Sequence, residues 1–284
     1  MRPPRLRDTV PLLALISAAC SPLNMFDRFV PKDGGVRKVA SARYADGPMG
    51  MLDVYAPKQT STTPRPVIVF FYGGSWQWGD RQPYTFVGKA LAARGFVTIV
   101  PDYRKVPEVR YPGFVEDGAA AVRWARAHAR DYGGDGERIV LAGQSAGAYI
   151  AAMLAVDGRW LGRDRAAVRG LVGLAGPYDF APFKTDASKA AFGQWPSPAE
   201  TQPVTHANAG SPPALLLTGD ADDVVRPRNS DALAAALIKA GVAAEVKRYP
   251  GIGHIGILTA IARPLRGKAP VLDDMSAFAA RVTR

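Results

Sequence analysis

Short, continuous apolar runs separated by stretches with helical spacing form the hydrophobic pattern of this chain. The run at 67–71 (VIVFF) contains no polar residue, which is typical of a strand buried on both faces of a parallel sheet. The pattern predicts strands at 36–45, 51–55, 67–71, 96–100, 138–142, 171–175, 214–218 and 244–249, and helices at 86–94, 114–129, 146–156, 230–239 and 273–282. Because strands alternate with helices, we predict an α/β fold with a mostly parallel sheet flanked by helices on both faces.

Residues 179–213 interrupt this alternation. They are rich in proline, alanine and polar residues, show no clean period and are long for a simple connection. We interpret them as a small cap over a functional site, and a surface loop without such a role is the alternative. The predicted main domain spans 36–284, with this cap as a short insertion.

The N-terminal pattern is that of a segment that directs export. Three arginines precede an apolar run at 10–19, which ends in small residues and is too short to span a bilayer. We therefore predict a signal peptide at 1–19, followed by an irregular tether at 20–35. An N-terminal helix of a protein retained in the cytoplasm is the disfavoured alternative.

Cys20 is the only cysteine of the chain. An intrachain disulfide and a zinc site built from cysteines are therefore excluded. Residues 17–20 (SAAC) resemble the lipobox of bacterial lipoproteins, although Ser17 stands where leucine is usual. The resemblance implies lipidation of Cys20 and membrane anchoring. A plain signal peptide, leading to a periplasmic or secreted protein, is the alternative.

The composition, 48% hydrophobic and 21% charged over 284 residues, is that of an ordinary globular domain. The net charge is +11, but the basic residues are scattered and form no dense run with interleaved aromatic residues. That distribution is typical of a solvated basic surface and argues against a nucleic-acid partner.

Residues 143–147 (GQSAG) match the G-x-S-x-G motif. They follow a predicted strand and begin a predicted helix, and in this context the glycines permit a sharp turn that raises the serine hydroxyl above the sheet. We therefore predict that Ser145 is a nucleophile and that the N–H of Ala146 faces the oxyanion formed during its attack. An ordinary glycine-bounded turn is the alternative.

A serine hydroxyl attacks efficiently only when a base removes its proton, and in folds with this motif the chain order is serine, acid, histidine. His128 precedes Ser145, and His206 lies in the predicted cap. His254 follows the last predicted strand, in a loop whose glycines let the chain turn back over the sheet. We therefore predict that His254 is the base.

The acid must follow a strand and precede His254. Residues 215–225 (LLLTGDADDVV) offer Asp220, Asp222 and Asp223. The acid fixes the imidazole tautomer and stabilises the imidazolium. Position and composition alone do not rank the three carboxylates.

From about Tyr44 to the C-terminus, the chain resembles α/β-hydrolase esterases of the hormone-sensitive-lipase and feruloyl-esterase-like group. The matching segments are 72–76 (YGGSW) with Gly79-Asp80 behind it, 101–104 (PDYR), the serine motif, 219–225 (GDADDVV) and Gly253-His254. The resemblance implies an α/β-hydrolase fold and a triad in which Asp222, from the family's G-x-x-D-x-x-V pattern, orients His254.

The segment after 67–71 resembles the family's HGG oxyanion motif, in which backbone N–H groups face the developing negative charge. By position in this motif, the resemblance implies that the N–H groups of Gly74 and Ser75, together with that of Ala146, are the oxyanion donors. Tyr72 stands where histidine, which normally braces the loop, is usual. The N–H chemistry of the loop does not itself require that histidine.

Together these features predict a carboxylic-ester hydrolase that acts on small or medium esters through an acyl-enzyme, with no metal or organic cofactor. An amidase, formamidase or peptidase on the same triad is the alternative within the fold. A non-catalytic surface lipoprotein that binds a ligand is the alternative from another class, and the complete triad argues against it. Haloalkane or epoxide hydrolysis on the same fold is a further alternative. Those enzymes have aspartate at the nucleophile position, where this chain has Ser145, so the sequence argues against it.

Single tryptophans pack in protein cores more often than they contact substrate, so aromatic residues are only weak candidates for the wall of an acyl or aryl pocket. Those candidates are Trp76, Trp78, Tyr84 and Trp195. Three further residues are interpreted as structural: Tyr103, Arg104 and Asp117.

Overall fold

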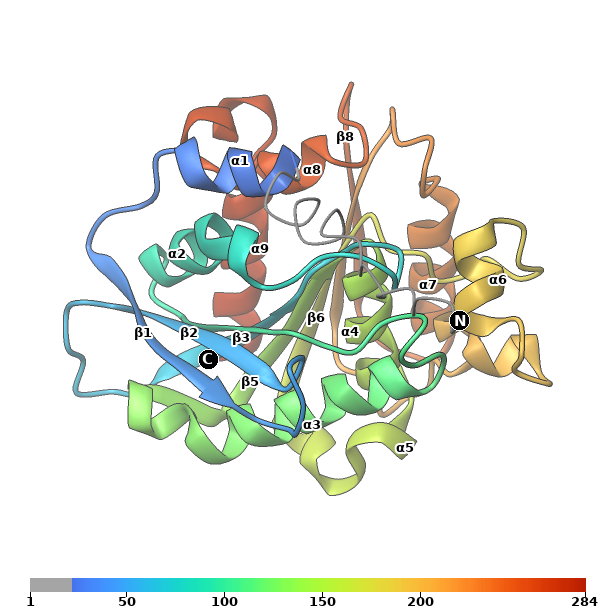
Figure 1. The fold of residues 1–284 in the computed structure, drawn as a ribbon, viewed down its shortest axis with the longest axis horizontal. Helices are drawn as coiled ribbons and strands as arrows, with labels where there is room; N and C mark the ends of the chain where they lie inside the picture. Colours follow the sequence, from blue (N-terminus) through green and yellow to red (C-terminus); the bar gives the residue numbers. More distant parts are fainter. Residues whose placement is uncertain (1–21) are drawn as a thin grey trace, which may run out of the picture.

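The computed structural model describes residues 22–284, in which eight strands form one sheet (Figure 1). The order across it is β1-β2-β4-β3-β5-β6-β7-β8. The strands are β1 (Val36–Arg43), β2 (Met51–Pro57), β3 (Arg65–Phe71), β4 (Val97–Pro101), β5 (Gly134–Gln144), β6 (Val168–Leu174), β7 (Ala214–Gly219) and β8 (Ala244–Tyr249). β2 runs antiparallel to β1 and β4, and every other neighbouring pair is parallel. The prediction of a mostly parallel sheet is confirmed.

Helices cover both faces of this sheet, as predicted. The longer ones are α2 (Thr85–Ala93), α3 (Gly113–His128), α4 (Ala146–Val156), α7 (Arg228–Lys239) and α9 (Val271–Val282), and the shorter ones are α1 (Pro22–Phe29), α5 (Gly158–Leu161), α6 (Asp186–Phe192) and α8 (Gly256–Thr259). α2 contacts α9 on one face of the sheet, while α3, α4 and α7 lie on the other.

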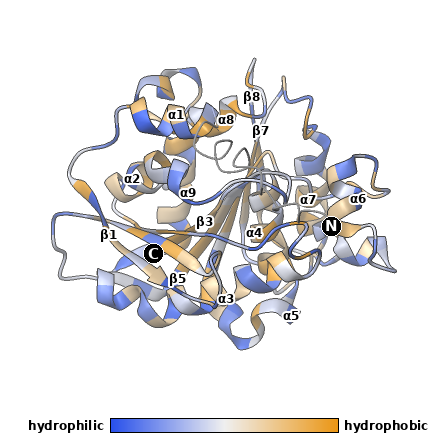
Figure 2. Cartoon of the chain, viewed as in Figure 1, coloured by the Kyte–Doolittle hydropathy of each residue, from blue (hydrophilic) through white to orange (hydrophobic). Residues whose placement is uncertain are grey.

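The central strands carry the core. Residues 67–71 of β3 and all residues of β4 and β7 are buried. α4 is buried along its whole length because its sequence (AGAYIAAMLAV) contains no charged residue and many small ones. Figure 2 shows apolar residues concentrated in the strands and hydrophilic residues on the outward sides of the helices. The loops after the parallel strands meet at one edge of the sheet, which is where open α/β sheets bind ligands.

Residues 22–29 differ from the predicted irregular tether, because they form the eight-residue helix α1. Phe26 meets Phe86 edge-to-face with ring centroids 5.4 Å apart, and the Asp27 carboxylate accepts a hydrogen bond from the Phe86 N–H at 2.8 Å. A helix this short is marginal alone, so these tertiary contacts stabilise it. The local pattern after Pro22 did not reveal them.

The predicted signal peptide at 1–19 and the lipidation predicted at Cys20 fall outside the described residues. Between residues 22 and 284, no helix has both the length and the apolar character that a membrane crossing requires.

The cap segment, which we define as residues 179–213, contains α6 and two short 3₁₀ helices, η5 (Pro198–Thr201) and η6 (Pro203–Thr205). Its interior is aromatic. Phe192 on α6 is completely buried, with its ring centroid 4.8 Å from that of Trp76, 5.5 Å from that of Phe114 and 5.2 Å from that of Phe180. These contacts join the cap segment to α3 and to the loop after β3.

Candidate active site

Ser145 lies at the turn between β5 and α4. Its φ of 54° and ψ of −123° form a conformation that residues with a side chain rarely adopt. Close contacts explain the glycines on either side. A Cβ on Gly143 would lie 2.4 Å from the Gly147 backbone, and one on Gly147 would lie 2.1 Å from the Phe71 carbonyl oxygen. The turn therefore requires both glycines, and it presents the serine at the edge of the sheet.

A hydrogen-bonded chain joins Ser145 to His254 and Asp222. Ser145 Oγ lies 2.9 Å from His254 Nε2, and Nδ1 of the same ring lies 2.8 Å from Asp222 Oδ2. With the ring hydrogen on Nδ1, His254 donates to Asp222 and accepts from the serine hydroxyl. The Asp222 side chain is completely buried, and its Oδ1 accepts the N–H groups of Val224 and Val225 at 3.0 and 2.8 Å. These bonds hold the carboxylate in line with the imidazole.

The two neighbouring aspartates take other positions. Asp220 is exposed, and its Oδ1 accepts the Gly251 N–H at 2.6 Å, which ties the loop after β7 to the loop after β8. Asp223 is exposed and lines the same pocket as Ser145. Of these three carboxylates, Asp222 is the one that contacts His254.

The other two histidines lie away from Ser145. His128 is at the end of α3, where its ring packs against Trp124 with centroids 4.8 Å apart. His206 follows η6, and its Nε2 lies 2.7 Å from the Glu200 carbonyl oxygen. Neither histidine joins the chain of hydrogen bonds to the serine.

The loop after β3 turns beside Ser145 through consecutive positive φ angles. The values are 126° at Gly74, 54° at Ser75 and 59° at Trp76. A Cβ on Gly74 would lie 2.1 Å from the Trp78 carbonyl oxygen, so this position requires glycine. The strained backbone directs the peptide groups of this loop in a way that a regular turn does not.

Three backbone N–H groups near the serine have no hydrogen-bond acceptor within the described residues, those of Gly74, Ser75 and Ala146. Ser75 and Ala146 line the same pocket as Ser145. Ala146 is the first residue of α4, so its N–H is one of those that a helix leaves unpaired. Ser75 and Ala146 thus have unpaired N–H groups at the wall of the pocket that holds Ser145, whereas Gly74 is not among the residues that line it.

A buried polar cluster holds the base of this loop. The Tyr72 hydroxyl donates to Asp102 Oδ1 at 3.0 Å and accepts from Lys105 Nζ at 3.0 Å. Asp102 also pairs with the guanidinium of Arg81. The Tyr103 hydroxyl donates to the Tyr72 carbonyl oxygen at 2.9 Å, and the two rings stack with centroids 4.7 Å apart. Tyr72, at the position where the family has histidine, therefore braces the loop through its hydroxyl, its ring and its carbonyl.

Burial dominates the ionisation of this cluster. It raises the pKa of the Tyr72 hydroxyl well above its ordinary value, and it lowers the pKa of Lys105 to about 8 against the opposing effect of Asp102. The pKa of the Asp102 carboxyl is raised because burial outweighs the pairing with Arg81. Lys105 is consequently the cluster member whose charge is lost most readily above neutral pH.

The residues interpreted as structural make internal contacts. The Tyr103 hydroxyl bond to Tyr72 is one of these. The guanidinium of Arg104 lies 2.7 Å from Asp117 Oδ1, and the Arg104 N–H donates to Asp117 Oδ2 at 2.8 Å, which joins the segment after β4 to α3.

Gln144 contacts His254, although no sequence pattern pointed to it. Its Nε2 donates to the His254 carbonyl oxygen at 3.3 Å and lies 3.4 Å from Nε2 of the ring. Gln144 occupies the variable second position of the G-x-S-x-G motif, so the motif carries no information about its side chain. Gln144 is therefore a second side chain, besides Asp222, that restrains His254.

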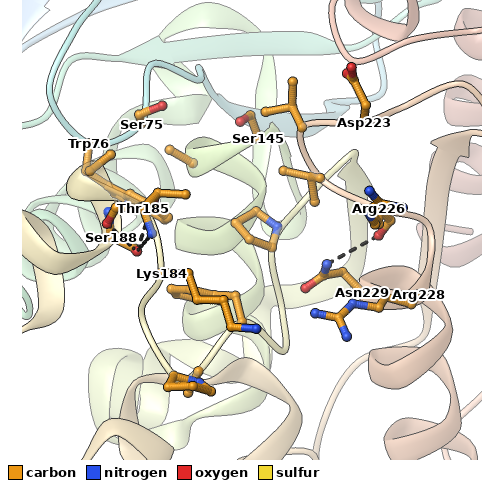
Figure 3. A pocket seen from close by; sticks show the side chains of 18 residues that line it. Ser75, Trp76, Ser145, Lys184, Thr185, Ser188, Asp223, Arg226, Arg228 and Asn229 are labelled. Atoms are coloured by element: carbon orange, nitrogen blue, oxygen red, sulfur yellow. Dashed lines mark hydrogen bonds between the residues drawn. The ribbon is translucent and has the colours of Figure 1, made fainter.

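A pocket of about 550 Å³ opens beside Ser145 (Figure 3). Trp76 and Phe180 form an aromatic part of its wall, with stacked rings whose centroids lie 5.9 Å apart. Further lining residues come from the cap segment, from the loop after β7 and from the start of α7, among them Pro182, Lys184, Thr185, Arg226 and Arg228. The basic residues of this wall were not identified from the sequence, because they belong to no motif and lie in two distant segments.

Of the four aromatic candidates for the pocket wall, Trp76 is the one that lines it. Trp78 is 72% exposed. Tyr84 is buried beside Tyr72, with ring centroids 5.3 Å apart, and the ring of Trp195 packs against Tyr111.

The chain is similar to known esterases. It is 32% identical over 206 residues to Esterase LipC of Mycobacterium tuberculosis, which covers 64% of this chain and 50% of that protein. It is 27% identical over 257 residues to the isoprenylcysteine alpha-carbonyl methylesterase ICME of Arabidopsis thaliana, which covers 82% of this chain and 60% of that protein. The chain thus spans about half the length of these curated relatives.

Solved structures show the same fold. A thermostable esterase from Pseudomonas putida ECU1011 superposes with a TM-score of 0.74 at 26% identity, covering 92% of this chain and 88% of that one. A truncated carbohydrate esterase from gut microbiota superposes with a TM-score of 0.72 at 22% identity, covering 89% of this chain and 99% of that one. The predicted α/β-hydrolase fold is confirmed. The BD-FAE family model matches residues 52–237, which is more than half of the chain, and the chain therefore belongs to the BD-FAE family.

Proposed function

We propose that this protein is a serine carboxylic-ester hydrolase that acts through an acyl-enzyme on Ser145. The observation that carries the proposal is the hydrogen-bonded chain from Ser145 through His254 to Asp222, which ends at a pocket. Membership of a family with esterase relatives supports the same chemistry. Fold and triad do not fix the substrate, so the class of ester rests on the pocket.

In the proposed reaction, Ser145 Oγ attacks the ester carbonyl while His254 Nε2 accepts its proton. The carbonyl oxygen becomes an anion beside the unpaired N–H groups of Gly74, Ser75 and Ala146, which need no rearrangement to stabilise it. Asp222 stabilises the imidazolium, and His254 then gives its proton to the leaving alcohol. A water molecule repeats these steps on the acyl-enzyme, which releases the acid and restores the serine.

The pocket volume of about 550 Å³ favours small or medium acyl groups, because a long alkyl chain needs a longer covered groove. We expect hydrolysis of p-nitrophenyl esters to be fastest toward the short end of a series from acetate to palmitate. Equal rates across the series would contradict the assignment of this pocket as the acyl site.

The test of the mechanism compares Ser145→Ala with Ser61→Ala, which changes an exposed serine in the loop before β3. We expect Ser145→Ala to lower kcat at least about 10⁴-fold and Ser61→Ala to leave it unchanged. A fluorophosphonate should add its mass to the peptide that contains Ser145 in the wild type only. Ester hydrolysis by pure, folded Ser145→Ala at the wild-type rate would refute the proposal, and turnover of amides in place of esters would favour an amidase.

We also propose export with lipidation at Cys20, on the N-terminal sequence pattern alone. Expression in a bacterium, followed by separation of membrane and soluble fractions, tests it. The wild type should be recovered with membranes and Cys20→Ala in the soluble fraction. Recovery of both in the cytoplasm would overturn the proposal.

A further inference from the structure

The pocket beside Ser145 is not uniform along its length. Near Trp76 and Phe180 its wall is aromatic, whereas Lys184, Arg226 and Arg228 line another part (Figure 3). Asp223 is the one carboxylate among the residues that line this pocket in the described chain. The wall therefore carries a net positive charge, and it does so within the pocket that holds the serine.

These cations approach the pocket from two segments. Lys184 belongs to the cap segment and precedes α6, while Arg228 is the first residue of α7. Figure 3 shows the head groups of Lys184 and Arg228 reaching toward each other across the pocket, and Asp223 at its far side. Within residues 22–284, no ion pair or side-chain hydrogen bond occupies the charged groups of Lys184, Arg226 or Arg228. Their charge is available to a ligand.

The segment that carries the arginines is held in place by the active site itself. Asp222 Oδ1 accepts the N–H groups of Val224 and Val225, and so fixes the loop that leads into Arg226. Asn229 Nδ2 then donates to the Arg226 carbonyl oxygen at 3.2 Å. The carboxylate that orients the histidine thus also sets the backbone from which the arginines extend.

The segment that leads to Lys184 is also held by hydrogen bonds. Asn229 Oδ1 accepts the N–H groups of Tyr178 and Asp179, both at 3.0 Å, which ties the start of the cap segment to α7. Gln202 Oε1 accepts the Phe180 N–H at 2.7 Å. Asn229 therefore ties the segment that leads to Lys184 to the segment that carries Arg226, and such support helps to pre-organise a binding site.

We propose that Lys184, Arg226 and Arg228 form a subsite for an anionic group, and that the preferred substrates are esters that carry a carboxylate or phosphate away from the scissile bond. This inference rests on the proposed ester hydrolysis and adds the class of ester. Guanidinium groups bind carboxylates and phosphates through two parallel hydrogen bonds, and a cleft with an excess of positive charge attracts anionic substrates even where its cations are exposed, as these three are.

The test uses pairs of esters in which a carboxylate replaces a terminal methyl group. On the acyl side, p-nitrophenyl hydrogen glutarate is compared with p-nitrophenyl valerate, and the hydrogen adipate with the hexanoate. On the alcohol side, p-acetoxybenzoate is compared with p-tolyl acetate. We expect a higher kcat/KM for the charged member on at least one side. The preference should shrink as sodium chloride is raised, because salt screens partly exposed charges.

Variants assign the preference to the cations. Lys184→Gln and Arg228→Gln should each reduce the ratio of kcat/KM for charged over neutral ester about two- to fivefold, and the double variant should reduce it further. Lys189→Gln on α6 and Arg163→Gln remove the same charges from exposed positions outside the pocket lining, and both should leave the ratio unchanged. Inhibition of valerate-ester hydrolysis by glutarate and by propyl phosphate distinguishes the two anions, since the stronger inhibitor carries the preferred group.

The inference is overturned if the wild type hydrolyses neutral esters but shows no preference for a charged ester on either side. It is also overturned if the preference survives in the triple variant Lys184→Gln, Arg226→Gln, Arg228→Gln. Failure of the proposed function is a different result, namely no hydrolysis of charged or neutral esters by a folded protein.

Discussion

The two walls of the pocket are supported in different ways. The loop after β3, residues 72–80, carries proposed oxyanion donors. This oxyanion loop rests on buried and half-buried ionisable groups, in which Tyr72 links Asp102 to Lys105. The cap segment instead stands on aromatic rings around Phe192. Trp76 connects the two, because it belongs to the loop and its buried ring packs against Phe192.

The difference predicts different responses to mutation and pH. A buried charge needs its partner, so loss of one member leaves another unpaired at high cost. Aromatic packing is spread over several rings, and no proton equilibrium enters it. Changes to the oxyanion support should therefore be severe and pH-dependent, whereas changes to the cap support should be graded and independent of pH.

Asp102→Ala should have the largest effect. The substitution removes the acceptor of the Tyr72 hydroxyl and a partner of Arg81. We expect the free energy of unfolding to fall by about 3–5 kcal/mol, which urea denaturation measures. Asp131→Ala, at an exposed aspartate just after α3, should change it by less than about 0.5 kcal/mol. Equal effects of the two substitutions would show that the buried Asp102 carboxylate does not support the loop.

Phe192→Leu should have the second-largest effect on stability. It keeps the cap segment apolar but loses the ring contacts with Trp76, Phe114 and Phe180. We expect a loss of about 1.5 kcal/mol, the same at neutral and alkaline pH. Phe29→Leu, at a phenylalanine that is 73% exposed, is the matched control. A strongly pH-dependent loss for Phe192→Leu would show that the two supports are not independent.

Tyr72→Phe should have a smaller effect on stability but a visible one on turnover. The ring stacking remains, while the hydroxyl bonds to Asp102 and Lys105 are lost. We expect a loss of about 1 kcal/mol and a lower kcat with little change in KM, since the loop donors act on the transition state. Tyr132→Phe serves as control, because its hydroxyl lies outside this cluster. An unchanged kcat would mean that the hydroxyl does not position the loop.

The smallest effect concerns Lys105. Burial lowers its pKa from 10.5 to about 8, so between these values the unfolded chain binds the proton and the folded chain has released it. Stability contributed by this residue therefore rises as the pH rises through that window. Lys105→Met should flatten the rise relative to wild type, and Lys58→Met, at an exposed lysine, should not. Comparison with wild type is needed because Tyr72, whose pKa burial raises, opposes the trend above about pH 10.

Local pattern was enough to locate most of the elements. The apolar run at 67–71 became the buried part of β3, and the predicted helix at 146–156 coincides with α4. Such segments are predictable because burial on both faces leaves a continuous apolar signal. α1 was missed because its stability comes from Phe86 and other distant residues, which local pattern cannot show.

The site was predictable to a lesser degree. The motif and chain order pointed to Ser145 and His254, but among Asp220, Asp222 and Asp223 the resemblance to a family was needed to prefer Asp222. The structure places the Asp222 carboxylate 2.8 Å from the imidazole. A shift of one or two residues along this loop changes the direction of the side chain, and composition does not reveal that direction.

The sequence by itself determined the α/β alternation, the sharp turn at Ser145 and the glycines that this turn requires. These depend on local sterics and on periodic burial, which a single segment carries in full. Only the tertiary structure decided that Tyr72 braces the oxyanion loop through Asp102, that Gln144 reaches His254, and that Lys184 faces Arg228 across the pocket. Each of these pairs joins segments separated along the chain, and their meeting depends on the order of strands in the sheet.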